Sequence, residues 1–345
     1  MPELRFNPLL GTYTMVAANR QNRPHLPKDY CPFCPGSGKV PDEYEVLIYK
    51  NDFPALSTEP EEVSSGSEFY NAEPAYGKCE VILYTSDHHS SLAQLSVERI
   101  KIVVDIWAQR TSELAKDEKI KFIFPFENKG EEVGVTMHHP HGQLYAYPFV
   151  PLKLKTELDN CRNYFLETGS CFFSEMNKVE TNEGKRMIFE NESFAAYIPY
   201  FSDYPYGVFI VTKTAKGSLS EMNETEKSDL AEVLKKITAA FDKLFNKSFP
   251  YMMCVHQTPV NSPEFGNAKE YFHFHIEFYP PLREENKIKW YASSEMGAWA
   301  AANTLSVEDC AERLRMLISV LKSENTFAQA VFASLANTLI TMEAL

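Results

Sequence analysis

Positive charge is scarce in this sequence. Its 345 residues include 34 Lys and Arg against 47 Asp and Glu, which gives a formal net charge of -13. A protein that binds duplex nucleic acid needs a basic surface to neutralise phosphates, so this balance argues against that class. A few local Arg and Lys residues are still enough to hold a single nucleotide.

Long hydrophobic runs and a secretory signal are also missing. No apolar run reaches the roughly 20 residues of a membrane span, and Met1–Arg5 lacks the charged-then-apolar layout of a signal peptide. The seven cysteines are an odd number spread over a long chain, which fits reduced thiols and metal ligands better than a disulfide framework. We therefore expect a cytoplasmic globular protein without a membrane partner, and a 44% hydrophobic composition supplies its core.

Histidine, by contrast, is concentrated. Eight of the nine histidines fall in four short stretches, and one of these reads His138-His139-Pro140-His141-Gly142-Gln143. Imidazole changes charge near neutral pH and serves as nucleophile, general base or metal ligand. Paired histidines can also be ordinary surface or core residues, but the other stretches supply partners of the right kind, so the pattern indicates a reaction centre.

The two halves of the chain carry the same order of elements. We expect, in order, a strand at 81–85, a helix after Ser96, a strand at 120–126, and then a strand at 207–212, a helix opening at Leu219 and Ser220, and a strand at 249–256. Each half closes on a His-x-His strand that leads to Tyr and Pro. We interpret this as an internal duplication of a strand-helix-strand-strand unit.

This order predicts an α+β fold with mainly antiparallel sheets flanked by helices. We divide the chain into an N-terminal half, 1–170, and a C-terminal half, 171–345. Residues 57–73, rich in Glu, Ser and Pro, predict a mobile loop, and residues 307–321 predict a closing helix.

The strand predicted at Phe272–Phe278 sorts its side chains by alternation. His273, His275 and Glu277 share one face, opposite the aromatic one. With His256 from the preceding strand they offer the ligand types of a divalent metal site. The alternative is a polar, solvent-facing side of an antiparallel sheet.

Cys31-Pro32-Phe33-Cys34 is half of a tetrahedral zinc site, which His88 and His139 could complete. A redox dithiol is the rival interpretation. It needs a helix after the first cysteine, and Pro35-Gly36-Ser37-Gly38 would break one. Structural thiols without a metal remain a third interpretation.

Several motifs follow one another in a fixed order: Cys31-x-x-Cys34, Asn51-Asp52-Phe53, Asp87-His88, Asn128-Lys129-Gly130, Gly134, His139-Pro140-His141-Gly142-Gln143 and His275-Ile276-Glu277-Phe278-Tyr279-Pro280-Pro281. In this order they resemble the galactose-1-phosphate uridylyltransferase family of the histidine-triad superfamily, from about Gly11 to about Arg315. The resemblance implies two histidine-triad-like halves, a duplicated half-barrel-like sheet with helices, and a homodimer.

The resemblance also implies the chemistry. His141 would attack the α-phosphorus of UDP-glucose, and the uridylyl-histidine intermediate would pass UMP to galactose 1-phosphate in a ping-pong cycle of galactose metabolism. The residue types suit this reaction, because a neutral imidazole can attack phosphorus and then leave. Gln143, on the same strand face, can donate its amide N–H to a phosphoryl oxygen. Histidine-triad hydrolases carry a third His at that position, so an amide there favours transfer over hydrolysis.

Further roles are implied position by position. Cys31, Cys34, His88 and His139 match structural zinc ligands, whereas Glu157, His256 and His275 match a second metal site, for iron or zinc. Some members carry His where this chain has Glu277, so either Glu277 or His273 is the fourth ligand. Contacts to nucleotide and phosphate match Arg20, Arg23, Asn51, Asp52, Asn128, Gly134 and Thr136, the last standing where serine is usual. The sugar end matches Lys289, Trp290 and Glu295, although a single charged residue is often only solvated.

Two other functions remain open. A sugar-nucleotide phosphorylase or another nucleotidyltransferase on the same scaffold would differ in the nucleotide and acceptor that restore turnover. A zinc-binding structural or redox module would have no catalysis, and replacing His141 would then change only stability.

Overall fold

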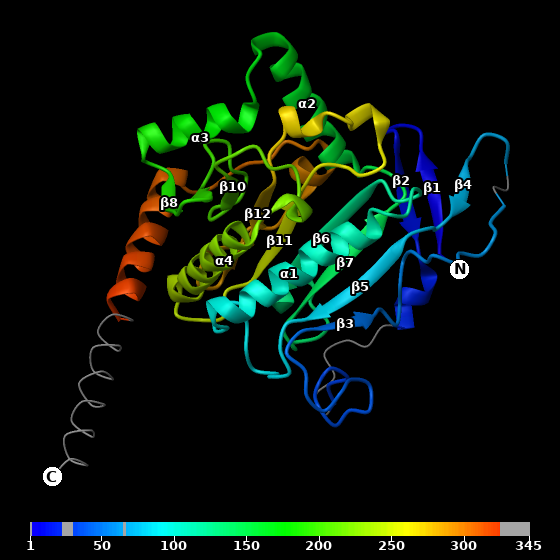
Figure 1. Cartoon of the computed structure of the whole chain (residues 1–345), viewed down its shortest axis with the longest axis horizontal. Helices are drawn as coiled ribbons and strands as arrows, with labels where there is room; N and C mark the ends of the chain where they lie inside the picture. Colours follow the sequence, from blue (N-terminus) through cyan, green and yellow to red (C-terminus); the bar gives the residue numbers. More distant parts are fainter. Residues whose placement is uncertain (1, 23–29, 65–66, 325–345) are drawn as a thin grey trace.

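The computed structural model describes residues 2–22, 30–64 and 67–324. Its strands (Figure 1) are β1 Glu3–Asn7, β2 Thr12–Val16, β3 Leu47–Lys50, β4 Ala72–Pro74, β5 Lys78–Leu83, β6 Phe122–Lys129, β7 His141–Tyr147, β8 Met187–Glu190, β9 Phe194–Tyr197, β10 Phe209–Thr212, β11 Tyr251–His256, β12 His275–Tyr279, β13 Leu282–Glu284 and β14 Lys287–Ile288. The α-helices are α1 Val97–Leu114, α2 Leu152–Thr168, α3 Phe172–Glu183 and α4 Glu224–Leu244, followed by a helix over residues 307–324.

One open antiparallel sheet organises the molecule. Its strand order is β3-β5-β7-β6-β11-β12-β10-β9-β8, and every pairing between these strands is antiparallel. Figure 1 shows α1 and α4 side by side across one face of this sheet. The predicted α+β class with mainly antiparallel sheets is therefore confirmed.

The strand order also contains the duplication. Reading outward from the central β6–β11 pair gives β6, β7, β5 on one side and β11, β12, β10 on the other. Each triplet arises from the same chain order of strand, helix, strand and strand, with α1 in one half and α4 in the other. The two His-x-His segments consequently lead into equivalent strands, β7 and β12.

Capping residues fix where the two long helices begin. Ser96 is the N-cap of α1, as predicted, and its side chain accepts a hydrogen bond from the Arg99 amide at 3.2 Å. The prediction that Leu219 and Ser220 open the second helix was wrong. Asn223 and Glu226 form a reciprocal capping box, so α4 starts there and a single 3-10 turn precedes it.

Apolar side chains from both halves form one main core. Trp107 of α1, Phe241 of α4 and Phe278 of β12 are fully buried in it. The strand predicted to start at Phe272 begins only at His275. Phe272 instead packs in a second cluster with residues of α2 and α3.

Other parts of the fold carried weaker sequence signals. Helices α2 and α3 and the small sheet β2-β1-β4 were not predicted. Between 57 and 71, excluding 65–66, the chain has no helix or strand beyond an isolated bridge from Ser57 to Tyr76, and β4 then begins at Ala72. The predicted closing helix is present over 307–324.

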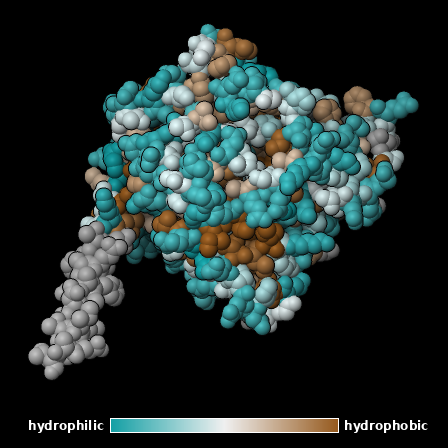
Figure 2. Space-filling view, viewed as in Figure 1, coloured by the Kyte–Doolittle hydropathy of each residue, from teal (hydrophilic) through white to brown (hydrophobic). Residues whose placement is uncertain are grey.

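One face of the molecule is mostly polar. Figure 2 shows hydrophilic residues over most of this face, with a patch of hydrophobic residues near its middle. Among the described residues, no helix combines the length and the apolar character that crossing a membrane requires.

Candidate active site and metal centres

Strand β7 begins at His141, and its side chains alternate between the two faces of the sheet. Leu144 points into the main core. His141, Gln143 and Tyr145 share the opposite face and look onto a cavity of about 210 Å³. A strand therefore presents the predicted nucleophile and its predicted amide partner to the same space.

The cavity gathers residues from distant parts of the sequence. It is lined by Arg20, Phe126, Asn128, Gly134, Val135, Thr136, His141, Gln143 and Tyr145. The Arg20 guanidinium donates to the Tyr145 hydroxyl at 3.2 Å. The Thr136 hydroxyl is buried without a hydrogen-bond partner among the described residues. Both groups can donate to an anionic ligand, so the cavity has the chemistry of a phosphate pocket.

A backbone carbonyl fixes the tautomer of His141. Its Nδ1 lies 2.7 Å from the His139 carbonyl oxygen, and because a carbonyl can only accept, Nδ1 carries the proton. In the neutral ring the lone pair is then on Nε2. That nitrogen is the one able to attack an electrophile.

The amide of Gln143 is oriented by its neighbour on the strand. The Tyr145 hydroxyl donates to Gln143 Oε1 at 3.4 Å, which assigns the amide oxygen to that side. The amide N–H groups are thereby the donors that Gln143 can offer to a bound phosphoryl oxygen.

Cys31, Cys34, His88 and His139 come together as predicted. One ligand atom from each lies within 4.8 Å of all the others. Cys34 Sγ is 3.3 Å from His88 Nδ1 and 3.7 Å from His139 Nδ1, and Cys31 Sγ is 3.8 Å from His139 Nδ1. Zinc bonds of about 2.3 Å to sulfur and about 2.0 Å to nitrogen, at tetrahedral angles, put ligand atoms about 3.3–3.8 Å apart. The cluster fits zinc, and both cysteines are free thiols rather than a disulfide.

The groups around this cluster favour a tautomer and a charge state that suit a bound cation. His139 Nε2 lies 2.8 Å from the Thr85 carbonyl, which holds the proton there and turns Nδ1 toward the thiols. Burial lowers the pKa of His139 to about 4, so the ring is neutral. Burial and the neighbouring Cys31 raise the pKa of Cys34 to about 11. A nearby positive charge would be needed to make it a thiolate.

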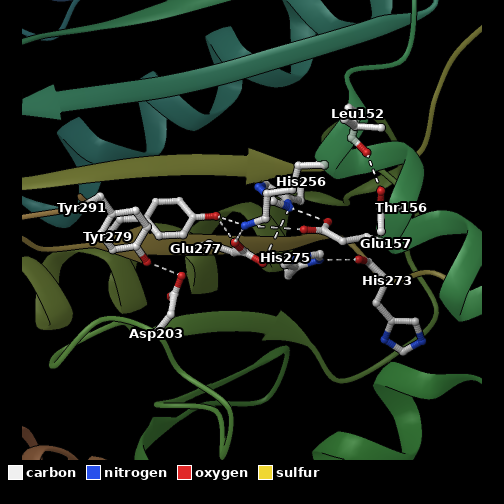
Figure 3. A network of polar contacts seen from close by, with 11 residues as sticks. Leu152, Thr156, Glu157, Asp203, His256, His273, His275, Glu277, Tyr279 and Tyr291 are labelled. Atoms are coloured by element: carbon white, nitrogen blue, oxygen red, sulfur yellow. Dashed lines mark hydrogen bonds and ion pairs between the residues drawn. The ribbon is translucent and has the colours of Figure 1, made fainter. Parts of the chain in front are cut away.

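A second cluster lies in the other half (Figure 3). Glu157 of α2, His256 of β11 and both His275 and Glu277 of β12 bring ligand atoms within 4.8 Å of one another. His256 Nδ1 is 2.8 Å from Glu157 Oε2, and His275 Nε2 is 3.3 Å from Glu277 Oε1. Burial opposes ionisation of Glu277, but His256, Lys153 and His275 outweigh it and hold the pKa of Glu277 well below its usual range.

Glu277 belongs to the second cluster, and His273 does not. The His273 ring points away from the cluster in Figure 3, with Nδ1 3.1 Å from the Thr212 carbonyl and Nε2 3.4 Å from the Ser174 hydroxyl. It loses the expected alternation because residues 272–274 are not yet part of the strand. Of the two candidates for the fourth position, only Glu277 lies with Glu157, His256 and His275.

The two halves repeat the same contact between a histidine ring and the backbone. His275 Nδ1 lies 3.0 Å from the His273 carbonyl, just as His141 Nδ1 lies 2.7 Å from that of His139. In both cases the first residue of the strand is a histidine whose ring is held by the backbone two residues earlier. The second half has Glu277 where the first has Gln143, so one repeat gathers carboxylates and the other a neutral amide.

Other predicted contacts lie outside the His141 cavity. The Asp52 carboxylate accepts from Tyr49 at 2.9 Å and pairs with Lys39 at 3.3 Å, and Asn51 Oδ1 accepts from the Phe53 amide. Arg23 lies outside the described residues.

The residues assigned to the sugar end also lie elsewhere. Lys289 is buried beside Glu295 at 3.8 Å, and the neighbouring Trp290 is 68% exposed. None of these three residues lines the cavity next to His141.

Some contributing residues were missed from the sequence. Tyr145 follows Gln143 by two on the same strand face, so alternation alone could have identified it. Lys153 precedes Glu157 by four on α2, and its Nζ is 2.5 Å from Glu277 Oε2. It was missed because α2 itself was not predicted.

The fold and the first site define a two-halved α+β protein in which strand β7 presents a histidine to a small polar pocket. Family models match both halves: the N-terminal domain of galactose-1-phosphate uridyl transferase matches residues 1–151, and its C-terminal domain matches residues 157–326. The chain belongs to the galactose-1-phosphate uridylyltransferase family.

Individual relatives cover nearly the whole chain. It is 39% identical to the galactose-1-phosphate uridylyltransferase of Thermotoga maritima, over 91% of this chain and 98% of the relative. The Haemophilus influenzae enzyme of the same name is 31% identical, over 94% and 97%. A solved uridylyltransferase structure aligns with a TM-score of 0.84 at 30% identity, over 92% of this chain and 99% of the other.

Proposed function

We propose that the protein transfers UMP from UDP-glucose to galactose 1-phosphate, giving UDP-galactose and glucose 1-phosphate. The observation that carries the proposal is the tautomer of His141, whose Nδ1–H is held by the His139 carbonyl on the wall of a polar cavity. Membership of the family supports the choice of substrates.

The first half-reaction forms a covalent intermediate. His141 Nε2 attacks the α-phosphorus of UDP-glucose, an N–P bond forms, and the P–O bond to glucose 1-phosphate breaks. The ring becomes positively charged as it reacts, and the hydrogen bond from Nδ1 to the His139 carbonyl stabilises that charge. Glucose 1-phosphate leaves as a phosphate anion and needs no proton from the protein.

The second half-reaction reverses the roles. A phosphate oxygen of galactose 1-phosphate attacks the same phosphorus, and the N–P bond breaks to restore neutral His141. Gln143, Arg20 and Thr136 lie on the same cavity, where their donors can bind the phosphoryl oxygens as charge spreads over them. These hydrogen-bond donors have fixed positions, so they can bind the phosphoryl group throughout both displacements.

Replacing Gln143 by histidine should shift the enzyme from transfer towards hydrolysis. A titratable ring beside the intermediate can move a proton to or from water, which an amide cannot do, and general acid–base assistance is worth about 10²–10⁴-fold. The measurement is UMP release from UDP-glucose without acceptor, divided by transfer with acceptor. Gln143→Asn, which keeps an amide, is the matched control, and an unchanged ratio in Gln143→His would contradict the role of Gln143.

We also propose that the first cluster holds zinc and that the second, made by Glu157, His256, His275 and Glu277, holds iron or zinc. Mixed imidazole and carboxylate ligands suit either metal. The zinc ligand His139 is two residues from His141, so this ion would fix the backbone on which the nucleophile stands. The second ion would tie α2 to β11 and β12 and supply rigidity rather than chemistry.

Glu277→Gln should therefore lower stability more than it lowers the rate. Loss of one carboxylate weakens the second metal site and replaces the charged partner of Lys153, 2.5 Å away, by a neutral amide. We expect loss of one metal equivalent and a melting temperature lower by several degrees. Transfer by the folded fraction should change less than about 3-fold, because none of the residues of this cluster lines the His141 cavity; loss of a residue that supports an active-site metal typically costs roughly 10–100-fold. An unchanged metal content would contradict the second site.

We further propose that the protein is a cytoplasmic homodimer. Its seven cysteines are all free thiols, as a reducing compartment requires. Lys289, Trp290 and Glu295 do not line their own His141 cavity, which is expected if a second copy completes the sugar end. Light scattering on the purified protein tests the dimer.

Incubation with radiolabelled UDP-glucose, followed by a search for acid-labile label on the protein, tests the proposed uridylyl transfer.

A further inference from the structure

Glu127 is a buried carboxyl that the proposed mechanism does not use. It lies on β6 with 5% of its surface exposed, one residue from Phe126, which pairs with Gln143 of β7. Its Oε1 accepts from the Tyr251 hydroxyl at 3.1 Å. Its Oε2 is buried with no hydrogen bond of good geometry among the described residues. A buried oxygen in that state is costly, so its presence needs an explanation.

The Tyr84 hydroxyl is in the same state. It too is buried without a well-formed hydrogen bond. The Tyr84 hydroxyl and the backbone oxygen of Phe126, the residue before Glu127, both lie within 3.2 Å of the point where a Cβ atom on Gly142 would stand, so Tyr84 reaches the part of β6 that carries Glu127. Each of the two groups also affects the pKa of the other. Burial raises the pKa of Glu127 to about 7, although Lys129 and the hydroxyls of Tyr251 and Tyr84 act in the opposite direction. The carboxyl can therefore be a neutral donor next to Tyr84 at a pH where most carboxyls are charged.

Tyr84 lies directly against the segment that carries the nucleophile. A Cβ atom placed on Gly142 would be 2.1 Å from the Tyr84 hydroxyl, so this ring fills the space that a side chain would need. The Tyr84 amide donates to the Pro140 carbonyl at 3.1 Å. The next residue, Thr85, provides the carbonyl that contacts the His139 ring. The end of β5 thus holds residues 139–142 by three contacts.

We propose that Glu127 is a positioning residue: through Tyr84 it holds residues 139–142 against the end of β5, which keeps the His139 carbonyl in place to orient His141. The inference rests on the proposed function of His141. Glu127 and residues 138–141 line the same cavity of about 120 Å³, so the carboxyl lies close to the segment that it is proposed to position. Without the contact between Tyr84 and Glu127, residues 139–142 can shift. His141 Nε2 is then less accurately positioned for attack on the phosphorus.

Three variants separate this role from general stability. Tyr84→Phe removes only the hydroxyl, Glu127→Leu removes the carboxyl, and Glu127→Gln keeps the shape and the hydrogen bonding but cannot ionise. We expect Tyr84→Phe and Glu127→Leu to lower kcat by up to about 100-fold with KM unchanged, because misplacement of a reacting group by a fraction of an ångström to 1 Å is enough. Glu127→Gln should restore most of the rate.

The pH profile gives a second readout. Lys129, Asp242, Tyr84 and Tyr251 all affect the pKa of Glu127, and the histidines at 138, 139 and 141 line the same cavity. Ionisation of Glu127 replaces a buried neutral donor with a charge, so wild-type kcat should fall as pH rises through about 7. Glu127→Gln should lack that step. The matched control is Glu180→Gln. Glu180 is another buried carboxyl of raised pKa, but it pairs with Arg186 and lies far from Glu127 in the sequence.

A test that needs no turnover distinguishes this inference from the proposed function. Nitrogen NMR of ¹⁵N-histidine-labelled protein reports which ring nitrogen of His141 carries the proton. Wild type should show a protonated Nδ1, and Tyr84→Phe and Glu127→Leu should show a mixture. If Glu127→Leu does not fold, Tyr84→Phe and the profile of Glu127→Gln still decide. A raised KM with normal kcat, an unshifted pH step in Glu127→Gln, or an unchanged tautomer in Tyr84→Phe overturns the proposal.

Discussion

The variant His141→Gly is expected to lose uridylyl transfer almost completely, by a factor on the order of 10⁶, while keeping the wild-type fold. A covalent mechanism cannot run without its nucleophile, and removing one costs about that much in well-studied cases. The His141 side chain lies on the cavity wall rather than in the core, so little packing is lost. The measurement is exchange between UDP-glucose and galactose 1-phosphate, together with trapping of radiolabel on the protein.

A neighbouring histidine provides the control. His138 belongs to the same run, but its side chain is 55% exposed and lies 3.4 Å from Glu131. His138→Asn should keep both exchange and label, whereas His141→Asn should lose both. Label on a residue other than His141, or full exchange in either His141 variant, would rule out the assigned nucleophile.

Cys34→Ser is expected to remove one tightly bound zinc and to lower the melting temperature by on the order of 10 °C. Binding energy at a structural zinc site is also folding energy, about 10–16 kcal/mol in small zinc domains. Here the four ligands join a turn at Cys31–Cys34, the loop after β5 and the strand-leading His139. Metal analysis and thermal unfolding with and without a chelator measure the two effects.

The same variant should also be slower at temperatures where it is folded. Pro140 fixes one backbone dihedral between His139 and His141, so a metal that holds the first residue restricts where the second can point. Cys310→Ser is a suitable control, since Cys310 is buried on the helix over 307–324 and does not line the His141 cavity. Equal zinc content in wild type and Cys34→Ser, or a disulfide between Cys31 and Cys34 in the purified protein, would contradict the site.

Short-range sequence patterns determined much of this protein. Alternation placed His275 and Glu277 on one face of a strand, and Ser96 marked the start of α1, because both depend on backbone geometry within a few residues. The repeated order of strands and helices predicted the duplication, since each half must bury its own helix on its own strands. The resemblance then indicated which histidine to examine first.

Only the tertiary structure decided how those pieces meet. Whether Glu277 or His273 joins the second cluster depended on where β12 begins, which the strands on either side decide by pairing. Arg20 reached Tyr145 across 125 positions, and Glu127 came to lie beneath the segment of His141 through the pairing of β6 with β7. Such contacts depend on strand register and on helix packing over the whole sheet, and a sequence read locally contains neither.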